Sequence, residues 1–329
     1  MNYVNLGKSG LKVSKLCLGT MTYGSSTWRP WVLDKSDSEK IVQASVDRGI
    51  NFIDFANFYS MGMSEEIVSG ALSNYQRQNL VYTTKCFYAM SEDVNAKGLS
   101  RKHILDSIDG SLSRLKTDYV DIFMIHAFDP STPMEETMEA LHDVVKSGKA
   151  RYIGASTMFA WQFAKMNEIA RLNSWTPFSV MQCQLNAAYR EEEREMIPYC
   201  INEGIAVTPF SPLARGLLSG NASSLRNTSD QFTNFQYGDA VSANIAEAVM
   251  RVAKAKGVSS SQIALAWVLA RKGVTSTLIG VENVQQLEAN IQALKIELTK
   301  EELFEIDRQY TPCDVINDYV EHRISREPK

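Results

Sequence analysis

Short apolar segments alternate with longer amphipathic segments along most of the 329-residue chain. The apolar segments are rich in β-branched residues and carry few charges, which is typical of strands buried on both faces of a parallel sheet. We expect eight such strands, at Leu16–Thr20, Asn51–Asp54, Leu80–Thr84, Val120–Ile125, Tyr152–Ala155, Val180–Gln182, Ala206–Pro209 and Thr277–Ile279. Eight parallel strands that are each followed by a helix close into a (β/α)8 barrel, so residues 1–329 are predicted to form a single α/β domain of the TIM-barrel type.

The segments between the strands carry helix signals. Residues 100–115 and 132–149 place apolar side chains at the spacing of one helix face. Thr132 precedes Pro133, which predicts a helix capped by Thr132 with Pro133 at its first position. The alternative architecture, an open doubly wound sheet, usually shows GxGxxG after its first strand, whereas this chain has GTMTYG there.

Three segments fall outside the strand–helix repeat. The opening YVNLGKSGLKVSKLCLG predicts an N-terminal β-hairpin around a Lys-Ser-Gly turn. Ser211–Ala240 and the tail after Tyr310 are longer than ordinary connections, and segments of this length usually carry function. We expect both to lie as long loops over the C-terminal face of the barrel.

The overall charge and composition exclude several classes of protein. The net charge is −4 and no basic stripe is present, which argues against non-specific nucleic-acid binding. No apolar run approaches 18 residues, so no membrane span is expected, and the polar N-terminus shows no secretory signal. The five cysteines are scattered and never form CxxC, which favours reduced thiols and a cytoplasmic protein.

Chemically active side chains are predicted at the ends of three successive strands. Asp54 ends the second strand, Lys85 the third and His126 the fourth, and Tyr59 follows Asp54 in the next loop. Active sites of TIM barrels lie at this C-terminal face. Each residue alone has an ordinary alternative, such as a turn, a half-buried ring or a solvated charge. The four together are expected to form a proton-transfer site.

The chemistry of this group follows from its charges. A free tyrosine has a pKa of about 10, and a cationic Lys85 nearby is expected to lower the pKa of Tyr59. Asp54 would keep Lys85 charged, and His126 would hydrogen-bond a substrate oxygen or share the proton. Tyr59 could then protonate a carbonyl oxygen as hydride reaches the carbon. An alternative is a lyase that uses Lys85 as a Schiff base. No metal site is expected, because His126 and Asp129 lack further ligands at suitable spacing.

The chain resembles the aldo-keto reductases in several segments that run in order through most of its length. They are NLGKSGLKVSKLCLGTMTYG, GINFIDFANFYSMGMSEEIVSGAL, VYTTK, YVDIFMIHAFDPSTPMEETMEALHDVVKSGKARYIGAS, YREEEREMIP and PFSPLARGLLSG. The most similar branch holds aryl-alcohol-dehydrogenase-like proteins and potassium-channel β subunits. The resemblance implies NAD(P)H-dependent reduction of a small aldehyde or ketone, with Asp54, Tyr59, Lys85 and His126 as the catalytic tetrad. The channel subunits suggest a cofactor-bound regulatory subunit as another alternative. A homo-oligomer is compatible with the sequence.

The resemblance also implies where cofactor and substrate bind. Ser156 and Gln182 would hold the nicotinamide amide, Phe210 would stack on the ring, and the backbone after it would wrap the pyrophosphate. The full set of cofactor-binding residues implied in this way is Gly19, Thr20, Met21, Ser156, Gln182, Phe210, Ser211, Leu213, Gly216, Gly280, Glu282, Asn283, Gln286 and Asn290. The substrate pocket implied is Tyr23, Trp28, Phe55, Phe87 and Leu185.

Several positions depart from the family pattern. Phe210 stands where Trp or Tyr is usual, Thr157 where Asn or Ser is usual, and Phe55 where Thr is common. Leu185 replaces an aromatic residue near the site. These changes are expected to reshape the substrate pocket.

The loop after the last strand bears on the choice of cofactor. The family prior is NADP(H), and relatives that prefer NADPH often have Ser and then Arg or Lys near Glu282 and Asn283. A carboxylate at Glu282 would repel a 2′-phosphate, so NAD(H) is expected nearly as strongly. In the alternative, Glu282 points to solvent and Arg215 or Arg226 supplies the positive charge.

Overall fold

The computed structural model describes residues 1–220 and 229–315. In this part of the chain, eight parallel strands form one sheet in the order β10-β3-β4-β5-β6-β7-β8-β9. Their bounds are β3 Leu16–Gly19, β4 Phe52–Asp54, β5 Val81–Cys86, β6 Val120–Ile125, β7 Ala150–Ser156, β8 Val180–Gln182, β9 Ala206–Val207 and β10 Thr277–Ile279. A parallel bridge between Val207 and Val274 joins the two edges of the sheet, and the Thr275 N–H donates to the Val207 carbonyl at 2.9 Å. The predicted (β/α)8 barrel is therefore confirmed.

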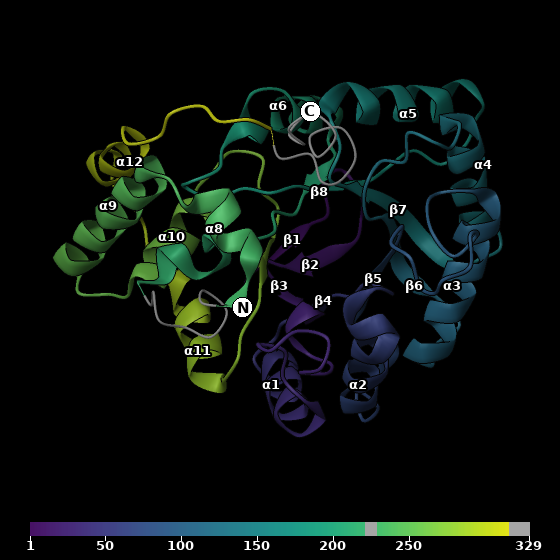
Figure 1. Ribbon diagram of the computed structural model, residues 1–329, viewed down its shortest axis with the longest axis horizontal. Helices are drawn as coiled ribbons and strands as arrows, with labels where there is room; N and C mark the ends of the chain where they lie inside the picture. The colour runs from purple at the N-terminus through teal and green to yellow at the C-terminus, as the bar shows by residue number, and fades with distance from the viewer. Residues whose placement is uncertain (221–228, 316–329) are drawn as a thin grey trace.

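Helices surround this sheet, as Figure 1 shows. Their bounds are α1 Lys35–Asp47, α2 Met63–Ala71, α3 Arg101–Leu115, α4 Met134–Lys146, α5 Ala160–Leu172, α6 Met196–Glu203, α8 Gln231–Tyr237, α9 Ala240–Lys256, α10 Ser260–Leu269, α11 Val284–Ala293 and α12 Lys300–Asp307. Side-chain caps fix several of their starts. The Ser100 hydroxyl accepts from the His103 N–H at α3, and Ser259 and Thr299 form capping boxes at α10 and α12. No helix in the described ranges is both long and apolar enough to cross a membrane.

The predicted start of α4 is wrong by one residue. The helix begins at Met134, and Pro133 rather than Thr132 is its N-cap. The Thr132 hydroxyl instead donates to Asp129 Oδ2 at 2.8 Å. Because Asp129 engages this hydroxyl, Thr132 stays in the loop that precedes the helix.

The N-terminal hairpin, also predicted, closes the N-terminal end of the barrel. It consists of β1 Tyr3–Asn5 paired antiparallel with β2 Lys12–Ser14, and it lies at the centre of the ring of strands in Figure 1. Lys8 N–H donates to the Gly204 carbonyl, and Ser14 N–H donates to Asn51 Oδ1, each at 2.8 Å. Gly7 has a positive φ of 57°, and an added Cβ there would lie 2.5 Å from the Gly204 oxygen. Only glycine fits this close approach.

Side chains from the strands fill two separate cores. One lies inside the barrel and consists of Leu6, Val13, Cys17, Phe52, Val81, Ile122, Met124, Val180, Ala206 and Leu278. The other lies between the strands and the helices, where neighbours such as Leu16 and Leu18 point. Because apolar side chains and the hairpin fill the barrel interior, a ligand site is left to the C-terminal face.

The long segment after β9 lies partly over that face. It includes a 3-10 turn, η5 Ala214–Ser219, which lines the cavity described below. The rest of this segment includes residues 221–228, which are outside the described residues, as is most of the tail after Tyr310. At the described start of the tail, the Tyr310 hydroxyl donates to Glu191 Oε1 at 2.5 Å.

Candidate active site

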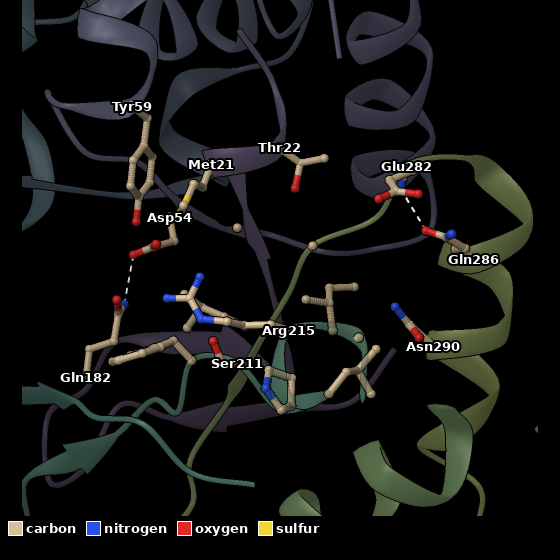
Figure 2. Close-up of a pocket in the computed structure, with 18 of the residues that line it drawn as sticks. Met21, Thr22, Asp54, Tyr59, Gln182, Ser211, Arg215, Glu282, Gln286 and Asn290 are labelled. Carbon is tan, nitrogen blue, oxygen red and sulfur yellow. Dashed lines mark hydrogen bonds between the residues drawn. The ribbon is translucent and has the colours of Figure 1, made fainter. Parts of the chain in front are cut away.

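A cavity of about 640 Å³ opens at the C-terminal ends of the strands. Its walls include Asp54 at the end of β4, His126 after β6, Ser156 at the end of β7 and Gln182 at the end of β8. Tyr59 lines the cavity from the loop after β4. Figure 2 shows Tyr59, Asp54 and Gln182 together at one end and Glu282, Gln286 and Asn290 at the other. The parallel strands thus bring residues that are far apart in sequence to one opening.

Lys85 and Asp54 form a fully buried ion pair beneath Tyr59. Lys85 Nζ donates to Asp54 Oδ1 at 2.8 Å, to Asp54 Oδ2 at 2.7 Å and to the Phe55 carbonyl at 2.8 Å. The Lys85 side chain is 0% exposed and that of Asp54 is 1% exposed. Burial by itself lowers the pKa of Lys85, but the Asp54 carboxylate outweighs this effect and the pKa lies above 10.5. The ammonium is therefore charged at neutral pH.

Tyr59 lies with its ring over this ammonium. Lys85 Nζ is 5.3 Å from the ring centroid, and Tyr59 as a whole is 8% exposed. Burial raises the pKa of Tyr59 above 10, and the Lys85 charge only partly offsets this. The expectation of a lowered pKa is wrong for this structure, because the low-polarity surroundings penalise the phenolate more than Lys85 stabilises it. Tyr59 therefore holds its proton at neutral pH.

His126 adds a neutral imidazole beside the phenol. Its ring centroid lies 5.8 Å from that of Tyr59, with the rings edge to face. Burial, and then the Lys85 charge, hold the pKa of His126 well below 6.5. At neutral pH the ring is uncharged, so it can hydrogen-bond an oxygen in the cavity without carrying a positive charge.

The backbone after Tyr59 is a strained turn. Ser60, Met61 and Gly62 have consecutive positive φ values of 49°, 54° and 92°. Left-handed conformations in residues other than glycine cost free energy and persist only where the surroundings impose them. Ser60 is tied down, because the Ser25 N–H donates to its hydroxyl at 3.2 Å. The turn directly follows Tyr59 and leads into α2 at Met63.

Gln182 connects the tetrad with the rest of the cavity. Its Nε2 donates to Asp54 Oδ1 at 2.9 Å, as the dashed line in Figure 2 shows. Ser156 lies nearby in the cavity wall, with its hydroxyl 3.1 Å from that of Thr157. Phe210 provides an apolar surface on the same wall. These side chains offer two polar groups and one flat apolar face to a ligand.

The segment after Phe210 turns tightly along the cavity wall. Ser211, Ala214, Arg215 and Gly216 all have positive φ, and all but Ala214 line the cavity. The Arg215 side chain extends into the middle of the cavity in Figure 2, and its guanidinium pairs with Asp230 at 2.7 Å. Arg226, the other cation that the sequence suggested here, lies outside the described residues.

The far end of the cavity is acidic and polar. Glu282 is exposed, and its backbone N–H donates to Gln286 Oε1 at 2.8 Å. Asn290 is buried one helical turn further along α11. Among the described residues, the cations that line the cavity are Arg29 and Arg215, and neither comes from this loop or from α11.

Most of the residues predicted to bind cofactor line this cavity. Twelve of them do so: Gly19, Met21, Ser156, Gln182, Phe210, Ser211, Leu213, Gly216, Gly280, Glu282, Gln286 and Asn290. Thr20 and Asn283 do not. Thr20 is buried and accepts hydrogen bonds from the Ser64 hydroxyl, while Asn283 caps α11 by accepting from the Gln286 N–H.

Most of the predicted substrate-pocket residues, in contrast, do not line the cavity. Trp28 lines the cavity. Phe55 packs edge to face on Tyr82 in the outer core, and Leu185 is fully buried there. Tyr23 is also buried, with its hydroxyl donating to the Val281 carbonyl, and Phe87 packs against the outer core. The structure therefore places four of the five outside the cavity wall.

Sequence reasoning missed several residues of the wall, and three of them are aromatic or charged and lie near Tyr59 and His126. They are Arg29, Phe58 and Tyr88. Phe58 directly precedes Tyr59, and Tyr88 follows Lys85 by three residues, so both lie next to site residues that were predicted. Arg29 lies in an irregular segment, where no periodicity could place its side chain.

Comparison with known proteins agrees with this geometry. The sequence model described as "Aldo/keto reductase family" matches residues 15–310. The chain belongs to the aldo/keto reductase family. It is 40% identical over 337 residues to a versiconal hemiacetal acetate reductase of Aspergillus parasiticus, covering 95% of this chain and 98% of the relative. It is 39% identical over 341 residues to an aldo-keto reductase of Fusarium vanettenii, covering 95% and 92%. A Schizosaccharomyces pombe protein named as an aryl-alcohol dehydrogenase is 40% identical over 343 residues, covering 95% and 97%.

As an aldo/keto reductase, the chain is an oxidoreductase of carbonyl compounds. The family generally uses NAD(P)H, and no cluster of side chains that could hold a metal ion occurs in the described ranges. The cavity suits a dinucleotide. Its volume is about 640 Å³, it offers hydrogen-bonding groups near the tetrad, and Arg215 extends into its middle.

Proposed function

We propose that the protein reduces an aldehyde or ketone to an alcohol, reversibly, with a nicotinamide dinucleotide as the hydride source and Tyr59 as the proton donor. The observation that carries this proposal is a protonated phenol held over a buried, charged lysine at one end of a cavity of about 640 Å³. When bound, the nicotinamide supplies hydride to the carbonyl carbon.

The residues of the tetrad then handle one proton and one developing negative charge. Tyr59 donates its proton to the carbonyl oxygen. Lys85 stabilises the phenolate that remains, and Asp54 keeps the ammonium charged and in position. The neutral His126 ring orients the carbonyl oxygen by a hydrogen bond. Because burial raises the pKa of Tyr59, the phenol is protonated across the neutral pH range, as the reduction requires.

The cofactor would extend along the cavity from the tetrad, with its nicotinamide near Tyr59. Ser156 and the oxygen of Gln182 would hold the nicotinamide amide, and Phe210 would pack on its ring. The backbone of residues 211–216 and the Arg215 guanidinium suit the pyrophosphate, since peptide N–H groups and arginine both favour phosphate oxygens. The adenosine end then reaches Glu282, Gln286 and Asn290.

We further propose that NADH serves at least as well as NADPH. The Glu282 carboxylate lies at the end of the cavity opposite Tyr59, where the adenosine would bind. There it would repel a 2′-phosphate and could accept from a ribose hydroxyl. Fluorescence titration with NADH and with NADPH tests this, together with Glu282→Lys, which should move the preference toward NADPH. A clear preference of the natural protein for NADPH would contradict the role given to Glu282.

Tyr59→Phe tests the proton donor. The variant keeps the ring but removes the hydroxyl, so cofactor binding should persist while carbonyl-dependent NAD(P)H oxidation falls by about 100-fold or more. Unchanged turnover would remove Tyr59 from its role. If the natural protein binds neither NADH nor NADPH, the proposed reaction has no hydride source and the proposed function is wrong.

The geometry disfavours a Schiff-base lyase. Lys85 Nζ donates to three acceptors, and its pKa is raised, so a neutral amine is scarce at neutral pH. Borohydride treatment in the presence of an aldehyde should leave Lys85 unmodified. A purely regulatory role would instead leave every tested carbonyl unreduced.

A further inference from the structure

Aromatic rings form a continuous wall around the proposed proton donor. Trp28 and Phe58 meet edge to face at 5.7 Å between centroids, and Phe58 and Tyr88 lie 4.9 Å apart. Tyr88 in turn lies 4.9 Å from His126, which contacts Tyr59 at 5.8 Å. All five line the same cavity. A flat, apolar substrate body fits such a wall better than a polar chain does.

A cation is built into this wall. The Arg29 guanidinium lies 4.4 Å from the Trp28 ring centroid and 5.7 Å from that of Trp31, and Arg29 also lines the cavity. A guanidinium that stacks on aromatic rings is restrained, and the planar fork of its N–H groups matches the geometry of a carboxylate. The Arg29 charge is close enough to Tyr59 to lower the pKa of that phenol, although burial dominates.

The two cations of the cavity differ in position. Arg215 belongs to the segment after Phe210 and pairs with Asp230, in the region assigned to the pyrophosphate. Arg29 lies instead on the aromatic wall beside the proton donor. A positive charge at that end is not required for the reduction of a neutral aldehyde.

From this arrangement, and resting on the proposed function, we propose that Arg29 selects an aromatic carbonyl substrate that carries a negatively charged group, such as a carboxylate. The ring of the substrate packs on Trp28, Phe58 and Tyr88, its carbonyl oxygen meets Tyr59 and His126, and its carboxylate meets the Arg29 guanidinium. The reaction itself is unchanged, since hydride from NAD(P)H and a proton from Tyr59 convert the carbonyl to the alcohol.

A matched substrate pair tests the role of the charge. 4-Formylbenzoate and its methyl ester have the same ring and the same aldehyde, but only the first is anionic. We expect kcat/KM for the acid to exceed that for the ester in the natural protein. In Arg29→Gln the acid-to-ester ratio should fall by about tenfold, which corresponds to about 1.4 kcal/mol. Lys165→Gln removes an exposed positive charge from α5, outside the cavity, and should leave the ratio unchanged.

The outcomes separate this inference from the proposed function. If both compounds are reduced and Arg29→Gln does not alter the acid-to-ester ratio, the role of Arg29 is overturned and the proposed function stands. Reduction of neither compound, nor of any other aldehyde, would overturn the proposed function itself. NADH affinity, measured by fluorescence in Arg29→Gln, gives a further check. A loss of cofactor affinity with an unchanged substrate ratio would place Arg29 at the cofactor phosphates instead.

Discussion

Replacing Asp54 by Asn tests how strongly the buried ion pair contributes to stability. The change keeps the shape of the side chain but removes the charge that faces Lys85, and it exchanges one acceptor oxygen for an N–H donor. Lys85 then loses its counter-charge while remaining 0% exposed. Breaking a buried ion pair in this way costs about 3–5 kcal/mol, so we expect a loss of that size in the free energy of unfolding.

The chain offers a matched control for this prediction. Lys102 Nζ lies 2.6 Å from Asp106 Oδ2, close to the 2.7 Å between Lys85 Nζ and Asp54 Oδ2. The side chains of Lys102 and Asp106, however, are 63% and 61% exposed. The same change, Asp106→Asn, should cost far less because solvent screens the pair. The assay is urea unfolding followed by tryptophan fluorescence, since the chain has five tryptophans. Equal losses in the two variants would refute the reasoning.

A double variant sharpens this test. In Asp54→Asn/Lys85→Met neither charge remains, so the double variant should be less destabilised than the sum of the two single variants by about 1–3 kcal/mol. Simple additivity would mean that the pair does not interact as its geometry indicates. Catalysis adds a second readout. In Asp54→Asn, Lys85 lacks its counter-charge and is expected to lose its proton through burial, and in Lys85→Met the ammonium is absent. Tyr59 therefore loses phenolate stabilisation in both single variants, and kcat should fall in both.

Three further predictions concern the strained turn, the loops and the thiols. Gly62→Ala should lower the free energy of unfolding by about 1–2 kcal/mol and reduce kcat, because φ is 92° and an added Cβ would lie 2.7 Å from Arg114 Cδ. Gly70→Ala is the control and should be neutral or stabilising, because a Cβ added there, on α2, meets open space. Urea unfolding and steady-state kinetics measure both variants. Burial alone would raise the pKa of Asp129, but hydrogen bonds from neighbouring hydroxyls and backbone N–H groups lower it below its ordinary 3.8, so Asp129→Asn should cost about 2 kcal/mol at pH 7. The gap between the two proteins should close as pH falls through the folded-state pKa, because the protonated carboxyl no longer contributes; a gap that is constant with pH would contradict this. A thiol reagent should label the native protein quickly at Cys313, which is exposed, and slowly at the other four cysteines, which are buried; fast labelling of several would contradict the burial.

The sequence predicted the architecture well because it rests on a repeated pattern. β6, β8 and β10 have the predicted bounds, and the other barrel strands differ by at most two residues at either end. Asp54, Tyr59 and His126 meet because parallel strands end at one face, which the order of the strands already implied. The hydrogen bond from Gln182 to Asp54 could not be predicted, since it depends on the curvature of the closed sheet.

The errors in the pocket have different causes. Phe55 directly follows Asp54 in extended chain, and successive side chains in a strand point to opposite faces. Since Asp54 faces the barrel opening, this alternation would have placed Phe55 in the outer core, where it lies. Arg29 gave no such signal, because its position depends on stacking against Trp28 and Trp31 in an irregular segment. The raised pKa of Tyr59 depends on burial, which the spacing of charges along the chain does not reveal.

The hairpin β1–β2 closes the N-terminal end of the barrel. With apolar side chains packed above it, the barrel interior offers no passage from one end to the other. Whatever enters must therefore leave by the same opening. For a reductase with two ligands, one exit means that the ligand seated deeper waits for the shallower one to depart. The order in which the two ligands are released is then set by their depth in the cavity. An insertion at the hairpin should leave that order unchanged as long as the N-terminal end of the barrel stays closed.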